Sequence, residues 1–315
     1  MILPHRSPDF FDGDASQNPV ILSLRDGSLA LYYVGLSCAG PSRGGPYSWH
    51  DCQDSANSSI GVAHAPRPEG PWTRSDRTIL AAARPVGFEG DATANPAAWQ
   101  EDDDSILFAY RGRHDAVLPL ATAPGWAGPY TRLHKNGSSA FNSSCAAQLC
   151  NASICLDRFK PGPGIFNISQ QPGSAAACGK SCDPRLATRI SCLEDPFLFR
   201  IKQGSYHMLV HNQARNPKPH PGTSDVDLGA HAYSADGKRW RVAKTGAYSR
   251  SQVFTDGTTI KLYRREEPKL LFQDGNATHL FNAACPNPVE CGHVLAVPLK
   301  HPIQLWERPP KLPHA

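Results

Sequence analysis

Short apolar runs, each followed by a turn and a second apolar run, recur along the whole chain. Val20–Leu24 and Leu29–Val34 flank an Arg-Asp-Gly-Ser turn, and Ala97–Gln100 and Ile106–Tyr110 flank an acidic turn. Apolar runs of this length, separated by turn residues, are typical of β-hairpins. No stretch has the 3.6-residue period of an amphipathic helix. We therefore expect an all-β chain.

Two further hairpins share this layout, Phe197–Ile201 with Tyr206–His211 and Lys269–Phe272 with Thr278–Asn282. In all four hairpins a polar residue followed by proline stands just before the first strand. These polar residues are Asn18, Asn95, Asp195 and Glu267. The first two belong to the same longer pattern, Gly-Asp-Ala-x-x-Asn-Pro, at 13–19 and 90–96.

A strand of small residues and a Gly-containing turn follow the hairpins, as at Gly70-Pro-Trp72 and Gly128-Pro-Tyr130. Repetition of a four-stranded unit predicts a β-propeller. A β-sandwich in which the prolines recur by chance is the alternative. Four units are visible in the sequence. Residues 1–11 are then either the outer strand of a blade closed by the C-terminus or the end of a further blade upstream.

Residues 134–190 break the repeat. They hold four Asn-x-Ser/Thr sequons, five cysteines and many Ser, Gly and Pro residues. Their apolar content is too low for a core of their own. We expect a disulfide-rich, glycosylated insertion within a single propeller domain that spans 1–315.

Composition indicates the compartment. The ten cysteines lack CxxC spacing, so zinc is not expected, and six sequons accompany them. An even cysteine count with sequons indicates disulfides and a secreted, extracellular glycoprotein, although no signal peptide is visible in this chain. Cys38–Cys52 and Cys285–Cys291 are the expected local pairs.

The same composition excludes several partners. A net charge of +4 with no basic run argues against nucleic acid. No apolar run reaches transmembrane length, so a membrane is not expected. No metal or cofactor motif is present, and the sequence leaves the oligomeric state open.

The order of the acid-Pro and Gly-Pro-Trp/Tyr motifs resembles the five-bladed propellers of the glycoside hydrolase family 43 and family 32/68 superfamily, over about residues 12–300. The resemblance implies a five-bladed all-β propeller that acts on carbohydrate without a cofactor. It also implies acids from three successive blades: a base or nucleophile, a helper Asp and a Glu acid. By position these are Asp14, Asp91 and either Glu194 or Asp195, and Glu267 enters if a blade is missing.

One departure from the family matters. Asn18 and Asn95 stand where the family has an acid, and an amide cannot act as a base. Either Asp14 and Asp91, four residues earlier, do the work, or the site binds sugar without cleaving it. Both aspartates follow a glycine and serve equally well as turn residues.

Other residues are candidates for substrate binding, each with a structural alternative. Trp99 would stack on a sugar or fill the core. Arg111 would likewise either contact the sugar or have a structural role. His211 and His231 stand near strand ends, and Arg265 would bind a substrate carboxylate or sulfate, or join Arg264, Glu266 and Glu267 in an ion-pair cluster. Asn18 and Asn95 complete the set of binding candidates.

The resulting expectation is a secreted hydrolase, a glycosidase that uses one protonated and one ionised carboxyl group. A catalytically silent carbohydrate-binding propeller is the first alternative, which the two Asn-Pro motifs favour. A sialidase-like hydrolase, with an arginine triad and a Tyr nucleophile, is the second. Ser234-Ala-Asp-Gly-Lys-Arg-Trp240 is one residue short of the Asp-box turn of sialidases.

Overall fold

The computed structural model describes the residues 3–4, 6–7, 9–36, 58–81, 93–112, 118–133, 193–212, 227–238, 240–243 and 246–306. The chain divides into two compact units. Unit 1 comprises Met1–His114, Pro119–Ser138 and Arg308–Ala315, and unit 2 comprises Asp115–Leu118 and Ser139–Glu307.

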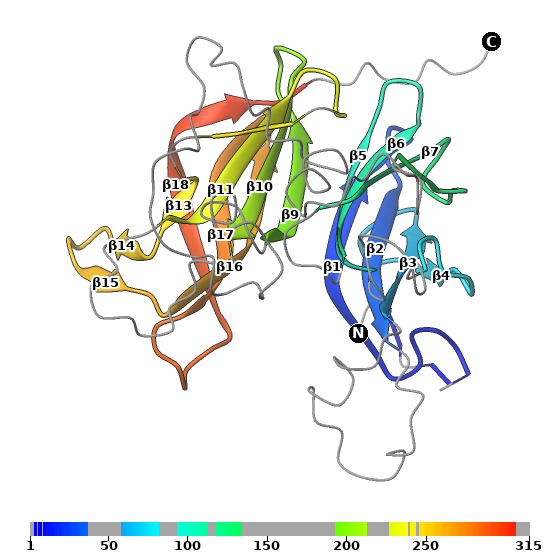
Figure 1. Cartoon of the computed structure of the whole chain (residues 1–315), viewed down its shortest axis with the longest axis horizontal. Coiled ribbons are helices and arrows are strands. Elements are labelled where there is room, and N and C mark those ends of the chain that lie inside the picture. Colours follow the sequence, from blue (N-terminus) through cyan, green and yellow to red (C-terminus); the bar gives the residue numbers. More distant parts are fainter. Residues whose placement is uncertain are drawn as a thin grey trace, which may run out of the picture. The chain divides into compact units, whose positions relative to one another are not determined.

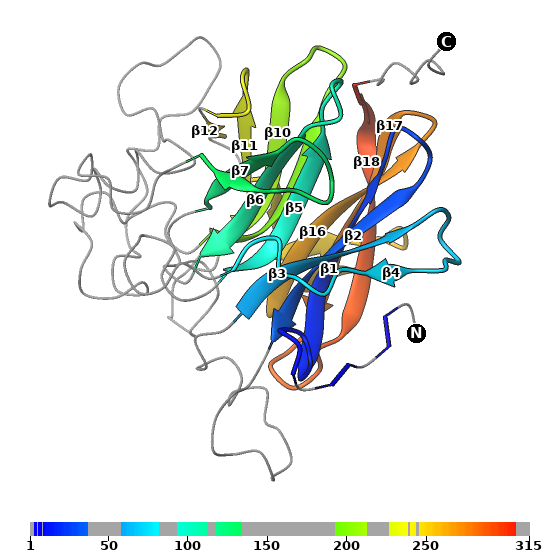
Figure 2. The same ribbon diagram turned by 90° about the vertical axis from the view of Figure 1, so that its right-hand side faces the viewer.

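Unit 1 contains two four-stranded antiparallel sheets, and each is an up-and-down meander (Figure 2). The first runs in chain order through β1 (Ala15–Ser23), β2 (Leu29–Leu36), β3 (Ser58–Ala65) and β4 (Thr73–Arg74). The second runs through β5 (Thr93–Gln100), β6 (Ile106–Gly112), β7 (Leu120–Ala123) and β8 (Thr131–Arg132). This is the sheet topology of a propeller blade.

One apolar core joins the two sheets of unit 1. Tyr32 and Ile60 of the first sheet are fully buried against Ile106 and Phe108 of the second. The rings of Tyr32 and Phe108 meet edge to face with their centroids 5.2 Å apart, an arrangement that aromatic quadrupoles favour. Alternate strand residues thus supply the apolar face that holds the two blades together.

Unit 2 contains two larger sheets and a small ribbon (Figure 1). One sheet consists of β9 (Leu193–Arg200), β10 (Tyr206–Asn212), β11 (Asp227–Ser234) and β12 (Arg241–Val242), with β13 (Tyr248–Ser249) also paired to β11. The other consists of β16 (Arg264–Gln273), β17 (Asn276–Cys285) and β18 (His293–Gln304). The ribbon consists of β14 (Ser251–Val253) and β15 (Thr259–Lys261).

The expectation of an all-β chain built of propeller blades is confirmed in the part that the structure describes, which contains no helix. Two blades belong to each unit, and they match the four repeats of the sequence. No fifth blade lies among the described residues, and residues 3–4, 6–7 and 9–11 form no strand. The insertion at 134–190 lies outside the described residues.

No helix in the described segments is long and apolar enough to cross a bilayer.

The innermost strand of each blade begins earlier than the sequence pattern indicated. The motif proline was expected to precede the strand, but Pro19, Pro96, Pro196 and Pro268 all lie inside β1, β5, β9 and β16. Each strand has a register shift at the motif. A bulge leaves one residue unpaired, so a proline, which lacks an N–H group, fits there without removing a sheet hydrogen bond.

The residue before each motif proline has a left-handed backbone. The φ angles are 49° at Asn18, 47° at Asn95, 52° at Asp195 and 51° at Glu267. This conformation costs a non-glycine residue about 1–2 kcal/mol, and such strain is typical of functional sites. The four hairpins therefore share one backbone feature, a left-handed residue before the motif proline. It interrupts the alternation of side chains along the strand.

A disulfide joins Cys285 to Cys291, as the sequence predicted. It closes the loop between β17 and β18. The other expected pair, Cys38–Cys52, lies outside the described residues.

Candidate active site

Two bulges of unit 2, in β9 and β16, bring three of the sequence-predicted acids together. Glu194 and Asp195 come from β9, and Glu267 comes from the equivalent position of β16. The backbone N–H of Glu267 donates a hydrogen bond to Oδ2 of Asp195 over 3.2 Å. Residues that are 72 positions apart in the chain thus meet through their two left-handed turns.

His211 ties the two acids of β9 to the neighbouring strand β10. Its Nδ1 lies 2.9 Å from Oε1 of Glu194 and 3.7 Å from Oδ2 of Asp195. The register places it directly opposite Glu194, and its side chain is 0 % exposed. A buried imidazole in this position can donate to a carboxylate or accept from a carboxylic acid, so it fixes where Glu194 points.

Burial is the main cause of the raised pKa of Asp195. The residue is 4 % exposed, and loss of solvation raises the pKa of its carboxyl group well above the usual value. The charges of Glu267 and Glu194 raise this pKa further, and Lys269 opposes them. Like charges that share a poorly solvated site cannot all ionise. We call Glu194, Asp195, Glu267 and His211 the acid cluster. It therefore contains a carboxyl group, that of Asp195, whose pKa lies above that of an ordinary aspartate.

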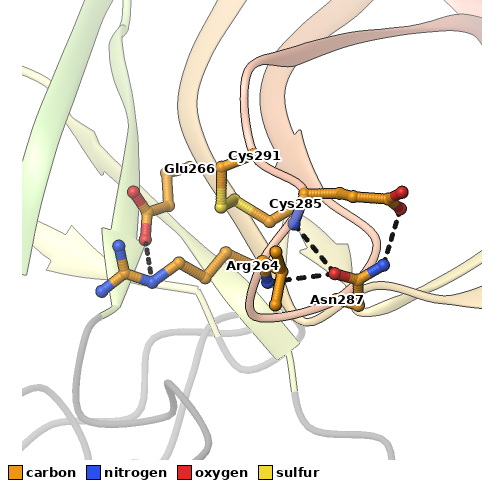
Figure 3. The surroundings of a disulfide bond; sticks show 7 residues. Arg264, Glu266, Cys285, Asn287 and Cys291 are labelled. Carbon is orange, nitrogen blue, oxygen red and sulfur yellow. Dashed lines mark hydrogen bonds and ion pairs between the residues drawn. A yellow bond between two sulfur atoms is a disulfide. The ribbon is translucent and has the colours of Figure 1, made fainter.

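A fourth carboxyl group, that of Glu266, lies close to the acid cluster, because one of its oxygens is within 4.8 Å of a ligand atom of Glu194 and of His211. Its Oε1 is 3.3 Å from Nε of Arg264. Figure 3 shows this ion pair beside the Cys285–Cys291 disulfide, and the loop that the disulfide closes is braced by Asn287, whose Oδ1 accepts from two backbone N–H groups. The disulfide and these hydrogen bonds therefore constrain the loop that lies next to Glu266.

Glu194, His211 and Glu266 also have the ligand types of a cation site. One ligand atom from each lies within 4.8 Å of the others, and this is the only such group among the described residues. Two carboxylates and an imidazole suit several divalent ions. The same atoms serve equally well as a hydrogen-bonded acid–base set.

Arg265 lies in the same unit but does not join the acids. Its Nε donates to Oδ1 of Asn282 over 2.8 Å, and its Nη1 donates to the carbonyl oxygen of Ser249 over 3.2 Å. Burial lowers its pKa to about 10. The expected ion-pair cluster forms in another way, because Glu266 pairs with Arg264, and Glu267 pairs with Lys269 over 3.0 Å. Arg265 instead clamps three strands together.

Tyr248 is a neighbour that the sequence analysis missed. The Arg265 guanidinium lies 4.9 Å from the centroid of its ring, and a Cβ built on Gly229 would be 2.2 Å from the ring. Burial, and then the charge of Asp195, raises the pKa of the hydroxyl well above its usual value. This hydroxyl has no hydrogen-bond partner in the described structure. No motif marks Tyr248, because its position depends on the pairing of β13 with β11.

The two sequence-equivalent residues of unit 1 also meet, but they are amides. Nδ2 of Asn18 donates to Oδ1 of Asn95 over 3.0 Å. Asp14 lies just before β1, is partly buried, and donates its backbone N–H to the carbonyl oxygen of Leu36. Asp91 lies outside the described residues. Unit 1 thus contains the motif backbone without a carboxyl group at the position before proline.

The remaining predicted binding residues occupy varied places. Trp99 is buried in β5 and is 5 % exposed, which fits the alternative interpretation of a core aromatic. Arg111 is partly buried near the end of β6. His231 lies within β11 rather than at its end, where its Nε2 is 2.8 Å from Nδ1 of His207. Burial lowers the pKa of both histidines to about 4, so this pair is neutral near pH 7.

The turn that resembles an Asp-box has a structural role. Asp236 accepts hydrogen bonds from the hydroxyl of Ser234 and from the backbone N–H of Lys238. The indole of Trp240 is fully buried and donates to the carbonyl oxygen of Gly237. The motif therefore closes the turn between β11 and β12.

Comparison with known proteins gives structural neighbours only. No family model and no curated protein matches the sequence. Among solved structures, the chain is similar to an exo-1,5-α-L-arabinanase from a bovine ruminal metagenomic library. The identity is 11 %, the alignment covers 91 % of this chain and 78 % of the other, and the TM-score is 0.47.

Two further structures show the same range of similarity. A family 43 β-xylosidase/α-arabinofuranosidase from a compost microbial metagenome is 16 % identical, with 90 % and 77 % of the two chains covered and a TM-score of 0.48. A family 117 glycoside hydrolase from the marine bacterium Zobellia galactanivorans is 13 % identical, with 93 % and 72 % covered and a TM-score of 0.43. Family 43, which the sequence resembles, is thus represented among the structural neighbours.

Proposed function

We propose that the chain is a glycoside hydrolase whose proton donor belongs to the acid cluster of unit 2. Cleavage of a glycosidic bond needs one carboxyl group that holds a proton and a second that is ionised. The observation that carries the proposal is the group of carboxyl groups around Asp195, where the backbone N–H of Glu267 donates to Asp195 in a part-buried contact and where burial and the neighbouring acids raise the pKa of Asp195. Glu194 and Glu266 supply two more carboxyl groups beside it.

Within this cluster we assign proton donation to Glu194. Its side chain is 9 % exposed, against 4 % for that of Asp195, so it is the carboxyl group of β9 nearer to solvent. His211 orients it through the 2.9 Å contact. Asp195 stays protonated and keeps the local negative charge low. His211 and Asp195 are positioning residues in this scheme, and Glu194 transfers the proton to the leaving oxygen.

Glu266 is our candidate for the second carboxylate. It pairs with Arg264 over 3.3 Å, and one of its carboxyl oxygens lies within 4.8 Å of the Glu194 and His211 ligand atoms. Asp14 of unit 1 is the competing candidate. If Asp14 acts as the base, Asp14→Asn abolishes turnover and Glu266→Gln does not.

A catalytically silent sugar-binding propeller is the second candidate function. It is favoured by the Asn18–Asn95 hydrogen bond, since these amides occupy the motif positions at which a base would be expected. A protein of this class would bind glycans and release no product. A sialidase-like enzyme would need a triad of arginines at one pocket, and the one buried motif arginine, Arg265, is already bonded to Asn282 and Ser249.

The test is a screen for release of reducing sugar from a panel of plant, algal and animal polysaccharides and aryl glycosides. The wild-type chain is compared with Glu194→Gln and with Glu290→Gln, which changes an exposed glutamate of the β17–β18 loop. We expect Glu194→Gln to lose about 100- to 10,000-fold in kcat and to keep glycan binding. Equal turnover by wild type and Glu194→Gln would move the acid elsewhere, and glycan binding without any turnover would identify the silent propeller.

We also propose a secretory, extracellular location. The six sequons and the Cys285–Cys291 disulfide support it, because disulfides persist in oxidising compartments. Fractionation of the native source, with an antibody against the chain, tests this location. Recovery from the medium or the secretory membranes is expected, and recovery only from the cytosol with free thiols would refute it.

A further inference from the structure

The tip of the β16–β17 hairpin carries a motif that the proposed activity does not use. Asn276-Ala-Thr278 has the form Asn-x-Thr, which is an acceptor sequence for N-linked oligosaccharide when x is not proline. It is the one sequon of six that falls within the described residues. Its geometry can therefore be examined directly.

The sequon begins at a tight, exposed turn. Asp274 and Gly275 connect the strands with φ angles of 49° and 72°, and two positive φ angles are typical of a type I′ hairpin turn. Gln273, Asp274 and Gly275 are exposed, and Asn276 is partly exposed. Nδ2 of Asn276 contacts only the neighbouring carbonyl oxygen of Asp274, at 2.9 Å. The acceptor amide thus lies at a surface turn and not in the packed interior.

The third residue of the sequon, Thr278, is partly exposed, whereas Ala277 between the two polar residues is buried. Oγ1 of Thr278 is bonded to Oε1 of Gln273 over 3.0 Å in an exposed contact, and it also lies 3.0 Å from Nδ1 of His279. An exposed side-chain hydrogen bond such as that to Gln273 exchanges readily with water. The acceptor amide and the hydroxyl therefore both lie at partly exposed positions of the hairpin tip.

Apolar surface next to the sequon gives a reason for a glycan there. Leu271 and Phe272, near the end of β16, are each 38 % exposed, in a part of the blade where the surrounding turn is polar. An attached oligosaccharide is bulky and solubilising and would shield these side chains from intermolecular contact. It would not block the acid cluster, because Gln273 is six residues beyond Glu267 along β16, about 20 Å at ~3.3 Å per residue.

We infer that Asn276 is an N-glycosylation site of the secreted chain. In the transfer, Nδ2 of Asn276 forms a bond to C1 of the first sugar of a lipid-linked diphosphate oligosaccharide. The bond from C1 to the diphosphate breaks, the amide loses one proton, and the lipid diphosphate leaves. This inference depends on the secretory location and is independent of glycosidase activity.

The experiment is expression of the full chain behind a secretion leader in a eukaryotic host, followed by glycopeptide mass spectrometry of the peptide that contains Asn276. Intracellular secretory membranes and medium are both sampled, so that retention of the protein does not prevent a result. The variants are Asn276→Gln and Thr278→Val, which remove the acceptor, and Thr278→Ser, which keeps a hydroxyl.

We expect Asn276 to be glycosylated in the wild type and in Thr278→Ser, and unmodified in the other two. Enzymatic removal of the glycan, or Asn276→Gln, should increase aggregation, and a further Leu271→Thr/Phe272→Thr change should reverse that increase. A wild-type peptide that is unmodified at Asn276 while another sequon of the same molecules carries glycan would overturn the inference. Loss of glycosidase activity would not affect it, because the readout is the peptide mass.

Discussion

In both units the residue before each motif proline has the same left-handed backbone conformation, but its side chain differs between the units. In unit 1 the residues before the motif prolines are Asn18 and Asn95, which share a hydrogen bond of 3.0 Å. In unit 2 the equivalent residues are Asp195 and Glu267, which meet through a 3.2 Å contact. All four have φ angles between 47° and 52°. The backbone conformation is therefore common to both pairs, but the side chains differ, and so does the contact: two amide side chains bond in unit 1, and a backbone N–H bonds to a carboxyl group in unit 2.

This difference separates a neutral pair from a titrating pair. An amide donates and accepts without gaining or losing a proton, so the Asn18–Asn95 contact is satisfied at any ordinary pH. In unit 2 the backbone N–H of Glu267, not its side chain, bonds to Asp195, and carboxyl groups that lie near each other repel when both ionise, a cost to which burial adds. The raised pKa of Asp195 follows from burial and from the charges of its neighbours. Exchange of amide for acid thus converts a structural contact into a proton-holding one.

Among the variants that test this comparison, the largest effect is expected from His211→Phe, which removes the imidazole that contacts Glu194 at 2.9 Å. We expect kcat to fall about 100-fold and the free energy of unfolding to fall by about 1–3 kcal/mol, because a buried carboxyl group loses its partner. Steady-state kinetics and denaturant unfolding measure the two losses. His211→Gln retains a donor and should recover part of kcat with a changed pH profile, whereas failure of both variants to alter that profile would contradict a positioning role.

Asp195→Asn gives unit 2 one of the amides that unit 1 has at its motif positions, and so leaves a pair of one amide and one acid. An acid with a raised folded-state pKa binds more protons in the folded state, so wild-type stability falls as the pH rises from about 3.9 through that pKa. The variant lacks this fall. At pH values above the raised pKa it should be more stable by about 1.4 kcal/mol per unit of pKa shift. Thermal unfolding from pH 4 to 9 checks this, and parallel curves for the two proteins would refute it.

The reverse exchange, Asn18→Asp with Asn95→Asp, should create an acid pair in unit 1. Two ionised carboxylates would replace the amide hydrogen bond. We expect this double variant to lose about 1 kcal/mol of stability above pH 6, with recovery toward pH 4 as one carboxyl group takes up a proton. The single variant Asn95→Asp is the matched control, because Asn18 can still donate to the new carboxylate. A double variant with no added pH dependence would show that the motif backbone does not force the two side chains together.

Lys269→Met should have the smallest effect. Lys269 and Glu267 are 30 % and 31 % exposed, and an ion pair of this kind contributes about 0.2–1 kcal/mol. Since Lys269 lowers the pKa of Asp195, its removal should move the alkaline limb of the pH–rate profile to higher pH. Lys261→Met, in β15, is a surface control. A shift of that limb to lower pH would contradict the assigned electrostatics.

Local patterns in the sequence predicted the hairpins, and of the acids expected to converge the described contacts bring together Glu194, Asp195 and Glu267. The spacing of turn residues located each strand pair, and the repeated proline motif indicated which residues are equivalent. The start of the strands was wrong, because a proline in a bulge leaves no local signal that distinguishes it from a proline before a strand. The position of Tyr248 and the contacts of His211 with the acids depend on cross-strand register, so they follow from pairings that no single stretch of sequence contains. Arg265 was placed among acids by its sequence neighbours, but strand alternation turns it toward Asn282.

The most direct test is a carbon-13 titration of the side-chain carboxyl group of Asp195 in chain labelled at aspartate, with Asp195→Asn to assign the signal. We predict that this carboxyl group remains protonated well above the ~3.9 of an unperturbed aspartate and that Glu267→Gln lowers its midpoint. A midpoint at or below the unperturbed value would contradict the claim that the acid pair of unit 2 holds a proton.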